Sequence, residues 1–409
     1  MRISRPRLFM KWSSSAILAR MVLISAMFNA SNSYGQSTVT AAASVRGFGD
    51  PLPGLTAAQL AAFNDGKADF ATAEDVSEGL GPIFNRDSCG ACHSGPSLGG
   101  SSHITATRFG QVTKSGFNPL TGMGGSLLQE RAISPEGLEQ IPRPANVVAL
   151  RQTPALYGSG LIEAIPDAVI LKGARRWPVN GVLGKASIVV DVASGKTRVG
   201  RFGWKGQHAT LLAFAGDAYL NEMGITNRLY PAENAPNGNQ SLLSLLDKVS
   251  DPEDVFDPKT GKAGIDMVAD YMRFLDAPPT KPLTISNVFG AKFFLDAGCA
   301  SCHTPFMMTG VSTTAALNLK VVPLYSDLLL HDMGSLGDGI AQDSAGPNEM
   351  RTAPLWGVGV GAPYLHDGRA KTLDDAIRAH DGEGRSARDW YLRLTPSQRE
   401  LLIDFLNSI

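Results

Sequence analysis

The sequence has no excess of charge of either sign and no basic patch. Lys and Arg number 37 against 38 Asp and Glu, so the formal net charge is −1. Because proteins that bind nucleic acid neutralise phosphates with clustered cations, this balance argues against nucleic acid as a partner. Long apolar runs are also lacking after residue 35, so nothing there reads as a membrane helix.

The composition is that of a folded, loop-rich protein. Of 409 residues, 43% are hydrophobic and 18% charged, which excludes a disordered chain. Gly (44) and Pro (25) are numerous but show no repeat of the collagen or low-complexity kind. The length allows one large domain or two ordinary ones.

The first 35 residues resemble an export signal. They contain five basic residues and no acidic residue, then the apolar run 21–28, then small residues at 33–35. This order predicts a signal peptide over residues 1–35 and a periplasmic protein. The alternative is an uncleaved anchor starting near Ala16, which would be the protein's only contact with a membrane. Arg20 and the shortness of the run argue against it.

Cysteine is scarce, and its placement is informative. The four cysteines form two pairs, each followed directly by a histidine: Cys89, Cys92 and His93, and Cys299, Cys302 and His303. Both read C-x-x-C-H, the attachment signature of c-type haem, in which two thiols bind the porphyrin vinyl groups and the histidine ligates the iron. A redox dithiol or half a zinc site would need only the cysteines. The repeated histidine therefore favours two covalently bound haem c groups.

The sequence after each motif repeats. Arg151-Gln-Thr-Pro-Ala-Leu-Tyr-Gly-Ser-Gly160 follows the first motif, and Arg351-Thr-Ala-Pro-Leu-Trp-Gly-Val-Gly359 follows the second. With one residue of gap, both read Arg, two residues, Pro, then Leu, an aromatic residue, Gly, one residue and Gly. Such a repeat predicts two units of related architecture.

Each unit is expected to end in a helix. Residues 265–275 place apolar side chains on one face, and the prolines at 278–279 end that helix. At the end of the chain, Thr395 is a suitable N-cap with Pro396 at the first helical position. We place the domain boundary near residues 276–284, which gives an N-terminal haem domain over 45–280 and a C-terminal cytochrome c domain over 281–409.

The N-terminal unit is the larger one and is expected to carry an insertion near residues 170–250. Within it, residues 188–192 and 197–204 flank a turn and predict a short β-hairpin. The expected fold class is therefore mainly α: two tandem cytochrome c-type haem domains, the first enlarged by an insertion with a β-hairpin.

These features are similar to those of a known family. The chain resembles the superfamily of di-haem cytochrome c peroxidases and MauG-like enzymes, and within it the di-haem oxidoreductase branch often labelled thiol oxidoreductases. The matching stretches are 161–167, 200–205, 329–334 and 363–369, and the resemblance covers most of residues 45–409. Every cysteine is committed to haem, so the thiol label finds no support in the sequence.

The resemblance also implies cofactors and partners. It implies hydrogen peroxide as oxidant and a small cytochrome or cupredoxin as electron donor. The peroxidases bind one calcium ion through backbone carbonyls, which leave no mark in a sequence. One Ca²⁺ is therefore a candidate cofactor without identified ligands.

For the second haem, the resemblance predicts a distal ligand. His366 lies in the superfamily motif Pro-Tyr-Leu-His-Asp-Gly, and the distal ligand of the C-terminal haem follows that histidine by fourteen residues, where this chain has His380. We therefore expect His303/His380 ligation, with a lower potential than a His/Met pair would have. The alternative is that Met333 or Met350 is the ligand and His380 lies at the surface.

The distal side of the first haem is less determined. His103 or Met123 as a sixth ligand would indicate an electron carrier. An open site with an acid/base group suits peroxide chemistry instead. The resemblance favours Glu163, in Gly-Leu-Ile-Glu-Ala-Ile-Pro, as that group, with His103 as a second distal candidate. The alternatives are a helix-capping or surface carboxylate for Glu163 and a loop histidine for His103.

The leading hypothesis is a periplasmic di-haem c-type oxidoreductase of the peroxidase type. The His303/His380 haem would relay electrons, and the His93 haem would activate peroxide or substrate. The alternatives are a non-catalytic electron-transfer cytochrome, a MauG-like enzyme that oxidises a partner protein, and an oxygenase. The sequence contains no signal for the oligomeric state.

Overall fold

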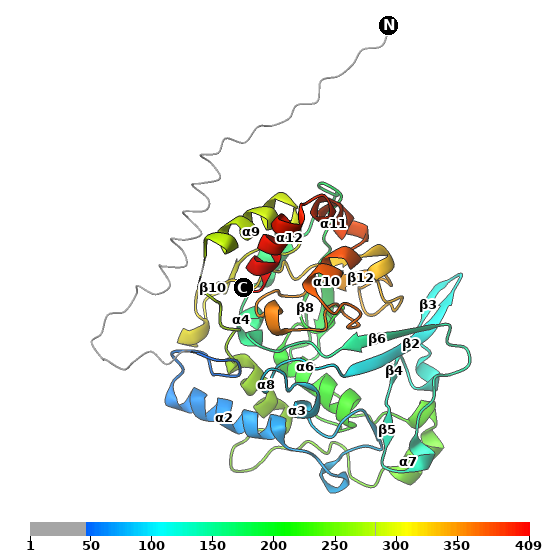
Figure 1. Ribbon diagram of the computed structural model, residues 1–409. Coiled ribbons are helices and arrows are strands. Elements are labelled where there is room, and N and C mark those ends of the chain that lie inside the picture. Colours follow the sequence, from blue (N-terminus) through cyan, green and yellow to red (C-terminus); the bar gives the residue numbers. More distant parts are fainter. Residues whose placement is uncertain (1–45, 283) are drawn as a thin grey trace. The chain divides into compact units, whose positions relative to one another are not determined.

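The computed structural model describes residues 46–282 and 284–409 (Figure 1). The predicted signal peptide, residues 1–35, lies outside the described residues. In the part of the chain that the structure describes, no helix has both the length and the apolarity needed to cross a membrane.

Helices make up most of the regular secondary structure of the described chain, and several small sheets lie between them. The α-helices are α2 (Ala57–Ala71), α3 (Cys89–Cys92), α4 (Ser159–Glu163), α5 (Asp167–Leu171), α6 (Leu211–Ala218), α7 (Gln240–Leu246), α8 (Gly264–Phe274), α9 (Ile285–Asp296), α10 (Leu373–Ala379), α11 (Arg385–Leu392) and α12 (Pro396–Leu406). The strands are β1 (Ile83–Phe84), β2 (Thr105–Thr113), β3 (Gly116–Asn118), β4 (Leu127–Leu128), β5 (Arg131–Ala132), β6 (Val147–Gln152), β7 (Ser187–Asp191), β8 (Lys196–Gly200), β9 (Met307–Met308), β10 (Val321–Val322), β11 (Leu330–Asp332) and β12 (Glu349–Arg351).

Both helices predicted at the ends of the units are confirmed. Helix α8 spans Gly264–Phe274, within one residue of the predicted range. Helix α12 begins at Pro396, and the hydroxyl of Thr395 accepts a hydrogen bond from the Gln398 amide, as an N-cap does. The local cap and breaker residues therefore decide where these helices begin and end.

Two helix pairs repeat the same close packing. Helix α2 packs on α8, and α9 packs on α12; the latter pair lies side by side in Figure 1. A Cβ on Gly66 of α2 would lie 2.1 Å from the Met267 carbonyl oxygen of α8. A Cβ on Gly290 of α9 would lie 2.0 Å from the Leu401 carbonyl oxygen of α12. Each pair thus needs a glycine where the two backbones cross.

The glycines of the two sequence repeats adopt similar backbone conformations and make similar close contacts in both halves of the chain. Gly158 and Gly357 have left-handed backbones, with φ of 71° and 69°, and each precedes a short helical turn. Gly160 then lies against the backbone of α8, and Gly359 lies against Asn407 at the end of α12. The internal sequence repeat therefore corresponds to a repeated structural contact.

The hydrophobic core has two parts. The larger cluster takes side chains from α2, α4, α5, α6 and α8 and also from residues 307–329. The smaller one joins α9, α11 and α12 around Phe294, Tyr391 and Phe405. The larger cluster includes residues from both sides of the boundary predicted at 276–284, and that boundary stays a prediction.

The predicted hairpin is present as β7 and β8, paired antiparallel from Ser187↔Gly200 to Asp191↔Lys196. Strand β8 ends at Gly200 and not at Trp204, because Phe202 instead bridges to His208 and folds the chain back. A second sheet, in which β2 pairs with β3, β4 and β6, was not predicted. It brings residues 104–108 and 151–154 to the site described next.

Candidate active site

The first C-x-x-C-H motif forms the short helix α3, capped by the Ser88 hydroxyl, which accepts from the Ala91 amide at 3.2 Å. His93 follows as the C-cap. Its Nδ1 lies 3.0 Å from the Gly100 carbonyl oxygen, and since a carbonyl can only accept, Nδ1 carries the proton. Burial lowers the pKa of His93 to about 4, so the ring is neutral and its Nε2 lone pair is free for a metal.

The second motif has the same construction and adds a facing histidine. Nδ1 of His303 lies 3.0 Å from the Tyr325 carbonyl oxygen, and Nδ1 of His380 lies 2.8 Å from the Ala376 carbonyl oxygen. His380 is the C-cap of α10, and its ring centre lies 6.4 Å from that of His303. Burial lowers the pKa of both rings, that of His303 to about 4.

This spacing fits one iron between the two rings. A metal–imidazole bond is about 2 Å and each nitrogen lies about 1.1 Å from its ring centre, so a linear N–metal–N arrangement separates the centres by roughly 6.2 Å. The two sulfurs of the motif, on Cys299 and Cys302, are free of disulfide bonds. Met350, one of the alternative ligands, pairs with His331 across β11 and β12, and Met333 follows β11 in a turn.

A cavity opens beside His93. Its apolar wall includes Phe70, Leu156, Phe214 and Met272, and Cys89 and Cys92 also line it. Its polar groups come from several separate segments and include Arg108, Glu130, Gln152, Trp204, Gln207, Asp217 and Glu222. Of the histidines that the structure describes, His93 alone lines this cavity.

The structure places the predicted distal residues outside this cavity. Glu163 is not among the cavity-lining residues: its Oε1 accepts from the Leu211 amide at 2.7 Å, at the start of α6, and its Oε2 pairs with Arg273 Nε at 2.9 Å. It is a helix-capping carboxylate, because the amides at a helix N-terminus attract a negative charge. His103 has an exposed side chain outside the cavity, although the next residues line it. Met123 is 42% exposed and also outside.

Three carboxylates line the cavity, Glu130, Asp217 and Glu222, and the last two come from one helical stretch. Asp217 lies near the end of α6, and Glu222 lies on the π-helical turn Tyr219–Met223 that continues it. Such turns widen a helix locally and are frequent at functional sites. The sequence contained a signal for these two residues as site candidates: they are the only acids in the mainly apolar run 211–223.

The environments of the two carboxylates differ. Burial raises the pKa of Glu222, although Asn85 Nδ2 donates to it at 2.7 Å and Arg108 opposes the shift. For Asp217 burial acts in the same direction, but His208 and Arg108 outweigh it and the pKa is lowered. Two carboxyls in one cavity with pKa values moved apart are the usual arrangement of a proton carrier beside a fixed charge.

The cavity also has a cation suited to haem. Within the described chain, Arg108 has no carboxylate in ion-pair contact, and its buried Nε has no hydrogen-bond partner. A buried unpaired guanidinium N–H is costly, and a propionate of a bound haem would satisfy it. Together with the free thiols and the Nδ1-protonated His93, the residues present fit a covalently bound haem.

The stretch 200–205, one of those that carry the family resemblance, anchors part of this wall. Lys205 is fully buried; its Nζ lies 2.9 Å from Asp338 Oδ1 and donates to the carbonyl of Glu349 at 2.7 Å. The indole of Trp204, the preceding residue, donates to the Gln152 carbonyl at 2.8 Å. These contacts tie the cavity wall at Trp204 to residues 338–349.

Two further buried histidines, His331 and His366, contact other protein groups. His331 Nε2 lies 3.0 Å from Asp327 Oδ2, and its Nδ1 lies 2.7 Å from Glu383 Oε2. Burial opposes charging, but these hydrogen bonds, with a further one between His331 and Cys302, raise the pKa of His331 to about 12. His366 is buried, and its ring packs edge-on against Trp204, with ring centres 6.3 Å apart.

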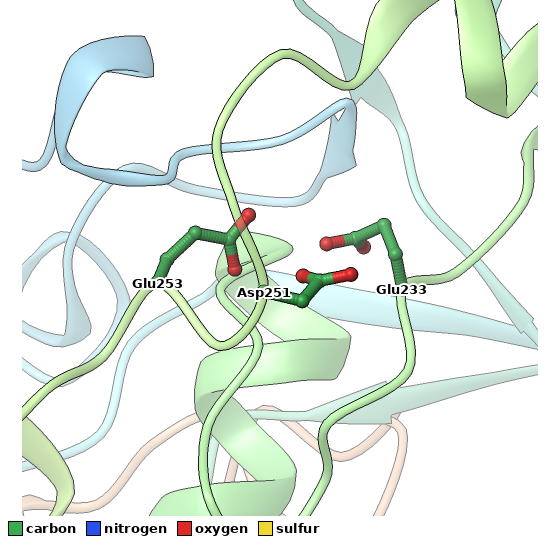
Figure 2. Close-up of side chains that lie close together, drawn as sticks. All are labelled: Glu233, Asp251 and Glu253. Carbon is green, nitrogen blue, oxygen red and sulfur yellow. The ribbon is translucent and has the colours of Figure 1, made fainter.

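One further group of carboxylates could attract a cation. Side-chain oxygens of Glu233, Asp251 and Glu253 lie within 4.8 Å of one another, and Figure 2 shows the three pointing together. The Thr226 amide donates to Glu253 at 2.6 Å, and burial raises the pKa of Glu233 to about 9, so a retained proton accounts for their proximity. The predicted Ca²⁺ stays a prediction.

Several solved structures cover most of the chain at low similarity. Hydrazine synthase of Kuenenia stuttgartiensis is 16% identical, with 92% of this chain and 99% of that chain covered and a TM-score of 0.39. The diheme peroxidase BthA of Burkholderia thailandensis is 14% identical, with 85% of each chain covered and a TM-score of 0.37.

Two curated relatives match part of the sequence. Cytochrome c551 peroxidase of Pseudomonas aeruginosa is 30% identical over 129 residues, which are 32% of this chain and 35% of the relative. Cytochrome c peroxidase Ccp of Escherichia coli is 26% identical over 192 residues, or 43% of this chain and 38% of the relative. The match therefore spans little more than a third of either relative.

The sequence profile described as "Di-haem oxidoreductase, putative peroxidase" matches residues 144–409. This stretch is more than half of the chain and contains the second C-x-x-C-H motif, His380, Asp217 and Glu222. The chain therefore belongs to the di-haem oxidoreductase family.

Proposed function

We propose that this protein is a periplasmic di-haem c-type peroxidase, in which two tandem cytochrome c-type domains each hold one haem. The observation that carries the proposal is the cavity at His93, where Glu222 and Asp217 have pKa values moved in opposite directions. Export is supported by the signal-like residues 1–35 and by the attachment of c-type haem outside the cytoplasm.

Each haem has its own set of holding residues in this proposal. Cys89 and Cys92 bind the first haem, with His93 as its axial ligand. Cys299 and Cys302 would bind the second, and His303 and His380, the C-cap of α10, would hold its iron. The three proposed ligand rings share one geometry, because a backbone carbonyl oxygen lies within hydrogen-bond distance of each Nδ1.

Glu222 is the residue we assign to proton transfer. When bound, the first haem would supply the redox chemistry that reduces hydrogen peroxide to water. Glu222 would take a proton from one peroxide oxygen and return it to the other, so that one oxygen can leave as water. Its raised pKa suits both directions of this exchange, while Asp217 stays ionised beside Arg108.

The second haem site suits electron relay. His303 and His380 would both serve to hold the iron, and the site lies beside the smaller hydrophobic cluster. The electron donor in this proposal is a small cytochrome or cupredoxin. Removal of the facing ring in His380→Ala should convert the second haem from low-spin to high-spin and leave the first unchanged, as EPR would detect.

Peroxide turnover of Glu222→Gln tests the function directly. General acid–base catalysis contributes about 10²–10⁴-fold, so kcat for peroxide reduction should fall by at least about 100-fold, with haem content unchanged. Glu163→Gln is the matched control, because the same substitution outside the cavity should leave kcat within about threefold. Equal activity of Glu222→Gln and the wild type would refute the assignment.

A specific observation supports one alternative, a di-haem electron carrier. Met223 and Met272 also line the cavity, and a thioether could complete the ligation of the first iron. A carrier would show two low-spin ferric haems that do not respond to peroxide, before or after half-reduction. Met223→Leu or Met272→Leu would then produce a high-spin signal, whereas the peroxidase would show such a signal in the wild type.

A further inference from the structure

One tyrosine has its side chain in the wall of the cavity beside His93. Of the tyrosines that the structure describes, Tyr219 alone lines this cavity. Its side chain is only 4% exposed, and it begins the π-helical turn that also presents Glu222. A haem held by Cys89, Cys92 and His93 would fill this cavity, so the phenol of Tyr219 is placed where it could exchange an electron with that haem.

The phenol of Tyr219 is hydrogen-bonded to a base. Its hydroxyl donates to Oδ2 of Asp69, near the end of α2, at 2.8 Å. Asp69 is partly buried, and burial raises its pKa to about 6, so its carboxylate is ionised at neutral pH and can accept a proton. An oxidised phenol is a strong acid, so oxidation becomes easier when a base already holds the phenolic proton in a hydrogen bond.

The elements that form the cavity wall also fix this pair. A Cβ on Gly264, the first residue of α8, would lie 2.5 Å from the Tyr219 hydroxyl oxygen, so the backbone there packs closely against the phenol. Asp69 directly precedes Phe70, which lines the cavity and packs against the His93 ring with ring centres 5.9 Å apart. The hydrogen bond between Tyr219 and Asp69 therefore joins two segments that both border the first haem site.

Other oxidisable side chains lack one part of this arrangement. Tyr271 is fully buried and packs against a phenylalanine of the cavity wall, but its hydroxyl donates to the Leu98 carbonyl at 2.8 Å. The indole of Trp204, in the cavity wall, also donates to a carbonyl, and a carbonyl only accepts the hydrogen bond. Tyr391 donates to the Asp374 carboxylate at 2.6 Å, but it lies in the smaller hydrophobic cluster and outside the cavity.

We infer that Tyr219 is a redox-active tyrosine, which gives an electron to the first haem and its phenolic proton to Asp69. The inference rests on the proposed peroxidase function. Hydrogen peroxide takes two electrons, and when no donor protein has supplied them, one comes from the haem and the other from Tyr219. The Tyr219 O–H bond breaks, an O–H bond forms at Asp69 Oδ2, and a neutral tyrosyl radical remains. A donor electron later reduces the radical, and Asp69 returns the proton.

EPR of the holoprotein tests this inference without a measurement of turnover. The fully oxidised holoprotein is mixed with equimolar hydrogen peroxide, without an electron donor, and frozen. The wild type should show a tyrosyl radical, whose signal narrows when the protein contains ring-deuterated tyrosine. Tyr219→Phe keeps the ring and should lower the radical yield at least about tenfold at unchanged haem content. Asp69→Asn keeps a hydrogen-bond acceptor but removes the base, so the radical should form at least about tenfold more slowly.

Tyr271→Phe is the matched control, because it removes a buried hydroxyl that contacts only a carbonyl, and it should keep the full radical signal. A wild type that reacts with peroxide but forms no tyrosyl radical would overturn the inference alone. The same radical yield in Tyr219→Phe, or loss of the signal in Tyr391→Phe, would also overturn it.

If Tyr219→Phe fails to take up haem, Asp69→Asn decides, and radical formation at the wild-type rate in that variant would overturn the inference. A wild type that does not react with peroxide would refute the proposed function and the inference with it.

Discussion

The crossing of α9 and α12 makes Gly290→Ala a sharp test of the fold. A Cβ at this position would lie 2.0 Å from the Leu401 carbonyl oxygen and 2.6 Å from Phe405 Cβ. A carbon–oxygen contact needs more than about 3 Å, so the helices must separate by about 1 Å, and overpacking of this kind costs about 1–3 kcal/mol or more. The better helix propensity of Ala returns about 1 kcal/mol.

We therefore expect Gly290→Ala to lower the free energy of unfolding by about 2 kcal/mol, measured by urea denaturation of the holoprotein. The neighbouring second haem should change its Soret and EPR signals before the first does. Gly66→Ala at the crossing of α2 and α8 should show the reverse order.

Gly122→Ala is the control, because nothing lies within 4 Å of a Cβ there and the backbone is outside the left-handed region. Its stability should match that of the wild type or exceed it by up to about 1 kcal/mol. A Gly290→Ala protein as stable as Gly122→Ala would contradict the close backbone contact between α9 and α12.

Three further predictions concern charge. Burial raises the pKa of Glu233 to about 9 from 4.5, so the wild type loses stability as the pH rises through that range. In urea denaturation, Glu233→Gln should therefore be more stable than the wild type at pH 8 but not at pH 4. A loss of stability at pH 8 would instead favour a cation at the cluster. His331→Gln breaks a buried pair with Asp327 and Glu383 and should cost about 3–5 kcal/mol below pH 6.5. This difference should shrink as the pH rises toward 12, and a constant difference would contradict the pairing. Arg108→Leu removes a cation from the cavity, so redox titration should show a lower potential for the first haem only, and equal shifts of both haems would contradict its placement.

Much of the site follows from local sequence. Attachment of haem needs two thiols and a histidine close together in sequence. The C-x-x-C-H motifs therefore predict Cys89, His93 and their counterparts as attachment residues without any knowledge of the fold. Helix ends are equally local: α8 spans its predicted range to within one residue, and α12 begins at Pro396, directly after the predicted N-cap Thr395. The hairpin β7–β8 depends on a short turn and was predicted for the same reason.

Residues far apart in sequence were harder to place. Counting along the family motif led to His380, and the fold sets its ring opposite that of His303. The same kind of argument led to Glu163, which the fold uses to cap α6. A carboxylate in a family motif has several possible uses, and only its neighbours in space distinguish them.

The sequence by itself predicted the two C-x-x-C-H sites, the repeat and the terminal helices, because each depends on residues within one or two helical turns. The tertiary structure alone decided which side chains line the cavity beside His93. Glu222 and Asp217 reach the cavity because α6 continues into a π-helical turn, and the other lining residues come from separate segments of the chain. Their opposite pKa shifts come from burial and from the charges of Arg108 and His208, which lie close in space but not in sequence.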